Sequence, residues 1–244
     1  MAKMCHSLDR RQETEHIVAF LDLLGASEII AGKNENRKSE DVLNSIAELF
    51  SYAELGFGQV EDAQSELRNL KCATFSDNIV FALDLSKMPK DKIALTVKDF
   101  LITITFFQSV ALEYYLLFRG GISLGSLYMD SNENFLWGKA LVDAHHLEER
   151  VAIYPRIVLS RQFEKKKFDL SQLPVCMDFD GIYFLDYMPT TIKLHPDWVE
   201  NATNLIEQEY NKASPAEENK EWGHERILQK YDWLKRYISR SRPI

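Results

Sequence analysis

The stretch His16–Gly25, HIVAFLDLLG, carries the first clear structural signal in the sequence. Its first seven residues form an apolar run of strand type that ends at Asp22, and Leu23-Leu24-Gly25 then breaks the run where a chain can turn into a helix. The sequence therefore predicts a buried strand with a carboxylate at its end, followed by a turn and a helix.

Segments of helical and strand periodicity alternate outward from this strand. Ser39 is a suitable N-cap for the first long helix, because Glu40 and Asp41 place acids in its first turn. Two β-rich runs flank Ser76-Asp77-Asn78, which predicts a hairpin with a carboxylate at its tip. In chain order we expect a helix at 39–52, strands at 70–75 and 79–83, a helix at 89–113, a strand at 115–127, a polar turn at 130–134, a strand at 135–137, a helix at 139–151, and strands at 156–160 and 182–187.

This order of elements predicts an α+β fold with a ferredoxin-like βαββαβ core and additions. Residues 1–15 form a polar leader, residues 16–194 the domain, and residues 195–244 a helical extension that packs on the domain or on a partner subunit. Within the extension, 219–242 has helical spacing and 213–220 is predicted to be a surface loop. Several catalytic families share this core, so the fold alone does not name a function.

The charge balance disfavours one class of partner. The 244-residue chain has 29 Lys and Arg against 37 Asp and Glu, a formal net charge of −8. We therefore expect no binding to nucleic acid, which requires a basic footprint. A nucleotide substrate is compatible with this charge, because a divalent cation can supply the positive charge that the protein lacks.

Cysteine content and hydropathy predict a cytoplasmic protein. The three cysteines have no CxxC spacing, so neither a disulfide framework nor a structural zinc site is expected: Cys5, Cys72 and Cys176. The N-terminus lacks the apolar segment of a signal peptide. The apolar run 100–118 contains polar and acidic residues, which predicts a buried helix and a buried strand, with no membrane association.

Asp22 and Asp77 are the first candidate site residues. In a βαββαβ sheet the first and third strands are neighbours, so the strand end and the hairpin tip can bring both carboxylates close together. Carboxylates at such a distance repel each other unless they share a proton or bridge divalent cations, as in two-metal phosphoryl-transfer sites. The alternative is that one caps a helix and the other lies in a surface turn.

Several further residues have two interpretations. The turn 23–26 either presents backbone N–H groups to a triphosphate or is an ordinary strand-to-helix turn. Arg119, which precedes Gly120-Gly121, either binds a phosphate or a base, or pairs with an acid. Tyr128 is more typical of a half-buried strand aromatic than of a base contact. His145-His146 are adjacent on the predicted helix and cannot address one site, which disfavours a dihistidine metal site.

Four motifs in one order resemble successive landmarks of the class III nucleotide cyclases. They are Phe20-Leu-Asp22-Leu-Leu-Gly25, Thr74-Phe-Ser-Asp77-Asn-Ile-Val-Phe, Arg119-Gly-Gly-Ile-Ser-Leu-Gly125 and Trp137-Gly138-Lys-Ala-Leu-Val-Asp-Ala144-His-His-Leu-Glu148. Each motif is short, but their common order and spacing over residues 16–190 are specific.

The resemblance implies a class III cyclase fold and attack of the ribose 3′-hydroxyl on the α-phosphate, with release of pyrophosphate. It assigns Asp22, Asp77 and the backbone carbonyl of Leu23 to two Mn²⁺ or Mg²⁺ ions in each site. In the family, the sites lie between the chains of a head-to-tail homodimer. The resemblance also places three residues against the triphosphate: Phe20, Leu24 and Gly25.

The chain departs from the family in the half of the site that reads the base. Ala73 stands where purine cyclases have a lysine or glutamate, and Phe135 stands where adenylate cyclases have an acid. Val142 and His146 stand at the positions of the transition-state asparagine and arginine, which leaves His146 as the third candidate catalytic residue. The metal half is retained, so the chain is expected either to act on another base or to have lost catalysis.

A narrower resemblance favours another base. The segments 118–129 and 143–148, with Asp180-Gly-Ile-Tyr-Phe-Leu-Asp186, look like the pyrimidine cyclases of bacterial Pycsar anti-phage systems. Those enzymes convert UTP or CTP to cyclic UMP or cyclic CMP, and the product activates a separate effector. Because uracil presents two acceptors to arginine, tyrosine and serine donors, we expect UTP to be preferred over CTP. The resemblance implies these specificity and substrate-contact residues: Arg119, Tyr128, Ala144 and His146, with Ser123 and Phe135.

Two alternatives remain open. A catalytically inactive cyclase-homology module that dimerises and senses nucleotide fits Val142 and His146, but it does not explain two retained carboxylates that repel each other. Another phosphoryl-transfer enzyme on the same scaffold, such as a diguanylate cyclase or a palm-type polymerase, is disfavoured because the sequence lacks a GG[DE]EF motif and is acidic.

Overall fold

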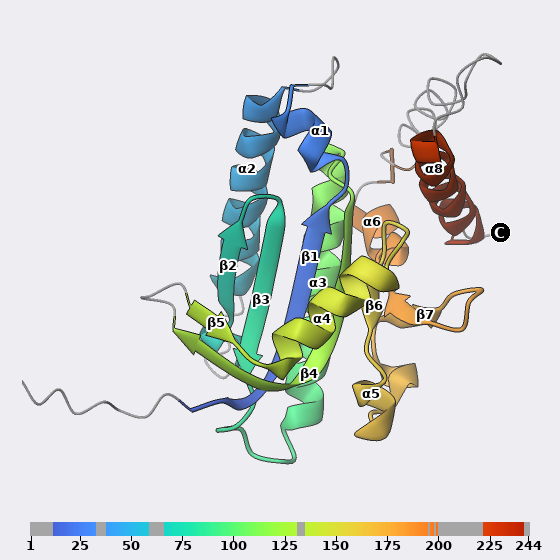
Figure 1. Cartoon of the computed structure of the whole chain (residues 1–244). Coiled ribbons are helices and arrows are strands. Elements are labelled where there is room, and N and C mark those ends of the chain that lie inside the picture. The colour runs from blue at the N-terminus through green and yellow to red at the C-terminus, as the bar shows by residue number, and fades with distance from the viewer. Residues whose placement is uncertain are drawn as a thin grey trace, which may run out of the picture.

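Eight strands form one sheet in the described part of the chain (Figure 1). The structure, a computed structural model, describes residues 12–32, 38–58, 66–130, 135–194, 196, 197, 199 and 222–241. The strands follow the order β2-β3-β1-β4-β6-β8-β7, with β5 paired to β4. Their bounds are β1 Thr14–Leu23, β2 Lys71–Phe75, β3 Asn78–Asp84, β4 Phe118–Asp130, β5 Phe135–Trp137, β6 Ile157–Leu159, β7 Val175–Met177 and β8 Tyr183–Leu185.

The strand order confirms the predicted α+β fold class with its βαββαβ core. β1 lies between β3 and β4 and is antiparallel to both, and β2 pairs with the outer edge of β3. Helices connect β1 to β2 and β3 to β4, as the split βαβ arrangement requires. The helices are α1 Ala26–Ile30, α2 Ser39–Gly58, α3 Ile93–Ala111, α4 Lys139–Arg150, α5 Gln162–Lys165, α6 Met188–Leu194 and α8 Trp222–Ser241.

The two faces of the sheet carry different helices (Figure 1). Alternation along β1 sends Ile17, Ala19 and Leu21 to the core that α2 and α3 cover, and sends Val18 and Phe20 to the opposite face, under α4. Beside α4, α8 covers β6 and β8 through a second apolar cluster. Phe20, a candidate site residue of β1, therefore lies on the α4 face, and the alternation places Asp22 on the same side.

The apolar run near residue 100 becomes a core helix, as predicted. α3, with the short 3₁₀ helix that follows it, is long and apolar enough to cross a membrane by composition. In the structure more than half of its residues are buried against the sheet, Phe100, Ile104 and Phe107 among them. The strand expected from Tyr115 begins only at Phe118, because Tyr115 adopts a left-handed conformation (φ 54°) that ends the 3₁₀ helix.

Other boundaries shift by a few residues. The hairpin turn consists of Ser76 and Asp77 alone, since Asn78 already belongs to β3. Periodicity does not predict α1, α5, α6 or β7, each of which is seven residues or shorter. α8 confirms the helix expected at 219–242. Part of the predicted leader (1–11), most of the turn 130–134 (131–134) and the loop 213–220 lie outside the described residues.

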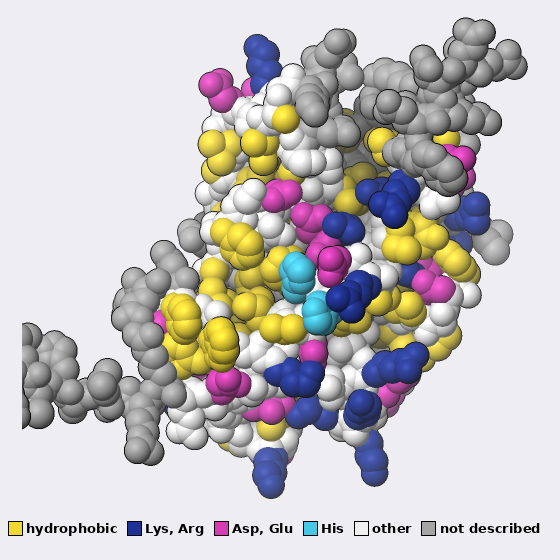
Figure 2. Space-filling view, viewed as in Figure 1, with side chains coloured by type: hydrophobic (Ala, Val, Ile, Leu, Met, Phe, Trp, Pro, Cys, Tyr) yellow, Lys and Arg dark blue, Asp and Glu magenta, His cyan; other side chains and the backbone are white. Residues whose placement is uncertain are grey.

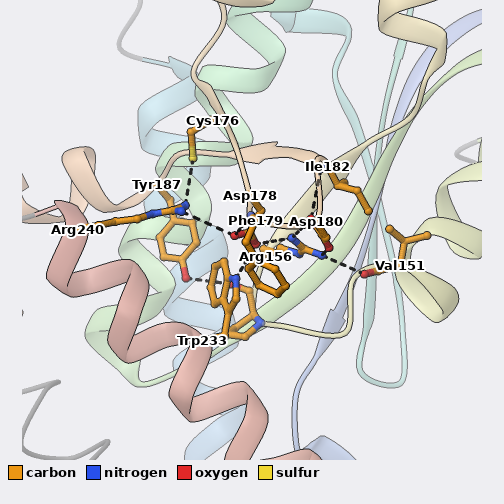
Figure 3. A network of polar contacts seen from close by, with 11 residues as sticks. Val151, Arg156, Cys176, Asp178, Phe179, Asp180, Ile182, Tyr187, Trp233 and Arg240 are labelled. Carbon is orange, nitrogen blue, oxygen red and sulfur yellow. Dashed lines mark hydrogen bonds and ion pairs between the residues drawn. The ribbon is translucent and has the colours of Figure 1, made fainter.

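α8 is attached to the sheet by hydrogen bonds as well as by apolar packing (Figure 3). The Trp233 indole N–H donates to Oδ2 of Asp178 at 2.6 Å. The Tyr237 hydroxyl donates to Oδ1 of Asp186 at 2.7 Å and accepts from the Met188 N–H at 2.9 Å. These partners follow β7 and β8, so α8 is held against the edge of the sheet farthest from β2.

Arg156 is the buried centre of this network (Figure 3). Its guanidinium pairs with Asp178 and Asp180 and also donates to the carbonyl of Val151, just after α4. Its own carbonyl accepts from the Gly120 N–H at 3.1 Å. One arginine thus joins the end of α4, the β7–β8 hairpin and β4, and through Asp178 it reaches α8.

Candidate functional site

The ends of β1 and of the β2–β3 hairpin bring Asp22 and Asp77 to one end of the sheet. β1 and β3 pair so that Asp22 lies opposite Asn78, and the Leu23 N–H donates to the Asp77 carbonyl at 3.1 Å. Ser76, which precedes Asp77 in the turn, has a left-handed conformation (φ 54°). The two carboxylates expected to be neighbours are therefore neighbours in the structure.

Arg119 lies directly opposite Asp22 on β4 and pairs with it. Its Nε donates to Oδ2 of Asp22 at 2.8 Å, while its Nη2 lies 2.6 Å from Oε1 of Glu148 on α4. Of the two interpretations of Arg119, the structure shows the acid partner, and the partner acids belong to the candidate site. A quarter of the Arg119 side chain is exposed.

Burial raises the pKa of Asp22 above its ordinary value. The hydrogen bond and charge of Arg119 oppose this effect, and the charge of Asp77 adds to it. A weaker opposing charge comes from Lys230 on α8. Burial likewise raises the pKa of Glu148 to about 6, against the charge of Arg119 and together with that of Asp22. Two carboxylates, those of Asp22 and Glu148, share one guanidinium, and the charge of Asp77 also acts on Asp22; such crowding favours a bound cation.

The donor set at this end of the sheet fits a divalent cation. The oxygens of Asp22, Asp77 and the Leu23 carbonyl are the ligand type that Mg²⁺ and Mn²⁺ prefer. Among the residues that the structure describes, no group of three or more His, Cys, Asp or Glu side chains is arranged to hold an ion alone. Mg²⁺ is usually held by one or two carboxylates together with substrate phosphates, so these oxygens would hold a cation weakly by themselves and more tightly together with a phosphorylated ligand.

The turn after β1 offers a ligand fewer N–H groups than the sequence suggests. The N–H groups of Leu23 and Leu24 already donate to the carbonyls of Asp77 and Leu117. Gly25 has a left-handed conformation (φ 80°) with open space around it, so only N–H groups from Gly25 onward remain for a phosphate. Phe20 is 4% exposed, with its ring against those of His145 and Phe75.

Tyr128 and Phe135 lie at the other end of β4. Their rings are 6.0 Å apart, and Phe135 is 39% exposed. Nine residue steps of about 3.3 Å separate Tyr128 from Arg119 along β4, so about 30 Å of strand lies between them. Ala73, half-buried, is on the edge strand β2. Within one chain, the structure does not bring Tyr128 and Phe135 to Asp22 and Asp77.

The predicted residues of α4 face in two directions. Ala144 is buried against the sheet, where its carbonyl would lie 2.3 Å from a Cβ on Gly121. Ser123 is fully buried beneath the same helix, so it is not on a surface that a substrate reaches. Val142 and His146, one turn apart, are both exposed on the outward side of α4.

The exposed side of α4 lies in the middle of one face of the molecule (Figure 2). Histidine side chains lie near its centre, with acidic groups beside them and apolar side chains around them. Four large apolar side chains of α4 and the nearby strands are at least 39% exposed: Phe75, Phe135, Trp137 and Val142. This face combines an apolar area with the charge cluster, the name used below for Asp22, Asp77, Arg119 and Glu148.

Glu148 is a residue of the charge cluster that is not among the predicted catalytic, metal-binding or substrate-binding residues. It ends the fourth motif and lies four residues after Ala144, on the same side of α4. Because Ala140 and Ala144 point toward the sheet, this spacing was the available signal that Glu148 also points inward.

The sequence matches no protein-family profile and no curated protein. Solved structures do show similarity. The guanylyl cyclase Cya2 is 13% identical with a TM-score of 0.46, over 70% of this chain and 90% of that chain. A monomeric guanylyl cyclase domain of the RhoGC fusion protein from the aquatic fungus Blastocladiella emersonii is 16% identical with a TM-score of 0.46, over 71% of this chain and 97% of that chain.

A third similar structure is the catalytic core of a rhodopsin-guanylyl cyclase with converted specificity, in complex with ATPαS. It is 15% identical with a TM-score of 0.43, over 71% of this chain and 96% of that chain. These identities and TM-scores are too low to assign a function. The motifs and the geometry of the charge cluster carry that assignment.

Proposed function

We propose that the protein is a divalent-cation-dependent nucleotide cyclase that converts UTP or CTP to the 3′,5′-cyclic monophosphate and pyrophosphate. The observation that carries this proposal is the convergence of Asp22, Asp77 and Arg119 at one end of the sheet. These residues come from three separate motifs that resemble those of class III cyclases in the same order. The convergence is what a phosphoryl-transfer site requires of them.

Four residues at this end of the sheet have a defined task in this reaction. Asp22, Asp77 and the Leu23 carbonyl would hold two Mn²⁺ or Mg²⁺ ions, which lower the pKa of the ribose 3′-hydroxyl and neutralise charge on the triphosphate. The 3′-oxygen attacks the α-phosphorus, its proton leaves to solvent, and the bond to pyrophosphate breaks. The planar guanidinium of Arg119 can donate two hydrogen bonds to phosphate oxygens and so orient the triphosphate.

A complete site requires two chains. About 30 Å of β4 separates Tyr128 from Arg119, so the metal half and the proposed base-reading half of one chain cannot surround one nucleotide. In a head-to-tail homodimer, Tyr128 and Phe135 of one chain would face Asp22 and Asp77 of the other. His146 would face the same nucleotide from the outward side of α4.

The proposed base specificity follows from the lack of polar side chains at two positions that read the base in purine cyclases. A half-buried Ala73 and an apolar Phe135 leave a purine edge without hydrogen-bond partners. Each unpaired polar group would cost about 1–3 kcal/mol, which favours the smaller pyrimidine ring. The Tyr128 hydroxyl can donate to a carbonyl oxygen of uracil, so UTP is the preferred substrate.

The resemblance to Pycsar cyclases also supports a cellular function. We infer that the cyclic nucleotide acts on a separate effector in anti-phage defence, and that the protein works in the cytoplasm, without nucleic acid or membrane.

An end-point assay with ATP, GTP, CTP and UTP, each with Mn²⁺, tests the proposal by mass spectrometry of the products. We expect cyclic UMP, and less cyclic CMP, from the wild type. Robust cyclic AMP or cyclic GMP without a pyrimidine product would overturn the base specificity. Binding of nucleotide without any cyclic product would instead support the inactive sensing module.

A further inference from the structure

Glu148 is the most buried acid of the charge cluster, and the proposed reaction gives it no task. Its side chain is 6% exposed, against 16% for Asp22, and its Oε1 lies 2.6 Å from Nη2 of Arg119. Its neighbour Glu149 has a side chain that is 56% exposed. A carboxylate is expensive to bury unless a charged partner compensates it, so the position of Glu148 depends on Arg119.

A glycine in β4 allows α4 to pack closely against the sheet, which brings Glu148 to Arg119. A Cβ on Gly121 would lie 2.3 Å from the Ala144 carbonyl and 2.5 Å from the Leu147 Cβ. Only glycine therefore allows α4 to approach β4 at this point. Glu148 follows one turn after Ala144, so the same close approach sets its distance from Arg119.

Arg119 has two carboxylate partners with different functions. Its contact with Asp22 is an aligned hydrogen bond, whereas its contact with Glu148 is an ion pair without hydrogen-bond alignment. A cation on Asp22 competes with the guanidinium for the same carboxylate and repels its charge. Arg119 must then give up Asp22, and Glu148 is the partner that remains.

We propose, on the basis of the proposed function, that Glu148 is a positioning residue that retains Arg119 in the site when Asp22 passes from the guanidinium to a cation. In this proposal Glu148 acts on the ion and on the phosphates through Arg119. It withdraws Arg119 from Asp22, which frees an oxygen for the ion, and it keeps the guanidinium beside the incoming phosphates. Without it, Asp22 is the one carboxylate partner left for Arg119 among the residues that the structure describes, and the guanidinium and the ion exclude each other.

A double-mutant cycle with Glu148→Gln and Arg119→Gln tests this, with Mn²⁺ affinity measured by electron paramagnetic resonance in the absence of nucleotide. We expect Glu148→Gln to weaken Mn²⁺ binding about tenfold, and Arg119→Gln to strengthen it. In the double variant the effect of Glu148→Gln should disappear. An equal effect of Glu148→Gln in both backgrounds would show general electrostatics and overturn the proposal.

Three controls separate this result from others. Glu149→Gln removes a neighbouring acid on the exposed side of α4 and should leave Mn²⁺ affinity unchanged. Glu148→Asp keeps the charge and should restore part of the affinity, and thermal unfolding shows that each variant is folded. In a product assay, Glu148→Gln should raise the KM for UTP more than it lowers kcat.

The outcomes also separate this proposal from the proposed function. If the wild type forms cyclic product but the effects of Glu148→Gln and Arg119→Gln on Mn²⁺ affinity are additive, only the proposed role of Glu148 is overturned. If the protein binds Mn²⁺ and the two effects are not additive, but no triphosphate gives a cyclic product, only the proposed cyclase activity is overturned. A wild type that binds no Mn²⁺ overturns both.

Discussion

The charged form of Asp22 is subject to two opposing effects. Its carboxylate is held by Arg119, yet burial and the charge of Asp77 both raise its pKa. A structural carboxylate would be more stable without a second acid beside it. This arrangement supports the proposed role of Asp22 as a metal ligand.

Asp77→Asn should abolish cyclisation, with a loss of more than about a hundredfold in kcat/KM, because the amide cannot replace an anionic metal ligand. Asp77 lies in a turn, so the melting temperature should change little. Asp84→Asn is the matched control: Asp84 ends β3, the strand that follows Asp77, and its Oδ1 accepts from Ser86. Substantial product from Asp77→Asn would refute the two-metal assignment.

Gly121→Ala should destabilise the protein by about 1–3 kcal/mol, because the new Cβ would overlap the Ala144 carbonyl. Thermal unfolding by circular dichroism measures the effect, about 2–4 °C per kcal/mol for a chain of this size. Gly125→Ala on the same strand is the control, since its Cβ would meet only ordinary contacts at 3.7 Å. Equal melting temperatures for the two variants would contradict the close approach of α4.

At the scale of elements, the docking of α8 depends on one buried arginine. Arg156→Met should destabilise the protein by about 3–5 kcal/mol, because Asp178 would keep a buried charge without its main partner. The exposed Arg161→Met is the control, and urea unfolding is the measurement. If both variants unfolded at the same urea concentration, the network in Figure 3 would contribute nothing to stability.

The same network predicts an acid-sensitive contribution to stability. Burial alone would raise the pKa of Asp180, but the hydrogen bond and charge of Arg156 outweigh it and hold the pKa below its ordinary value of 3.8. The unfolded chain therefore binds a proton more readily, and the stabilisation is present above about pH 4 and lost as the pH falls through the folded pKa. Asp180→Asn should flatten the dependence of melting temperature on pH below about pH 4, and an unchanged slope would refute it.

At the scale of the whole molecule, the exposed apolar area beside α4 predicts association. Trp137, 65% exposed on β5, is its largest side chain. Trp137→Glu should convert the homodimer to a monomer in light scattering and reduce activity about in proportion, because each site needs two chains. Leu95→Glu on the outer side of α3, at a residue 60% exposed, is the control. A monomeric wild type with full activity would exclude the shared site.

The sequence predicts the core of this molecule because its strands and helices are long. β1, β3, α3 and β4 each bury a regular pattern, and their order implies the sheet. Elements of three to seven residues, such as β7 and α6, contain too few periods for a pattern, and tertiary contacts determine them. Arg119 shows what the sequence could not predict at the site. An arginine at this position can pair with an acid or with a phosphate, and the packing of α4 against β4 is what identifies Glu148 as a partner.

The pairing of Asp22 with Arg119 has a consequence for how the protein folds. These residues are 97 positions apart, so β1 can pair with β4 only after a long loop has closed, which is a slow step. During synthesis, β1 must wait until the ribosome has released β4 and α4. A Mn²⁺ signal followed during refolding should accordingly appear after the helical circular dichroism has recovered.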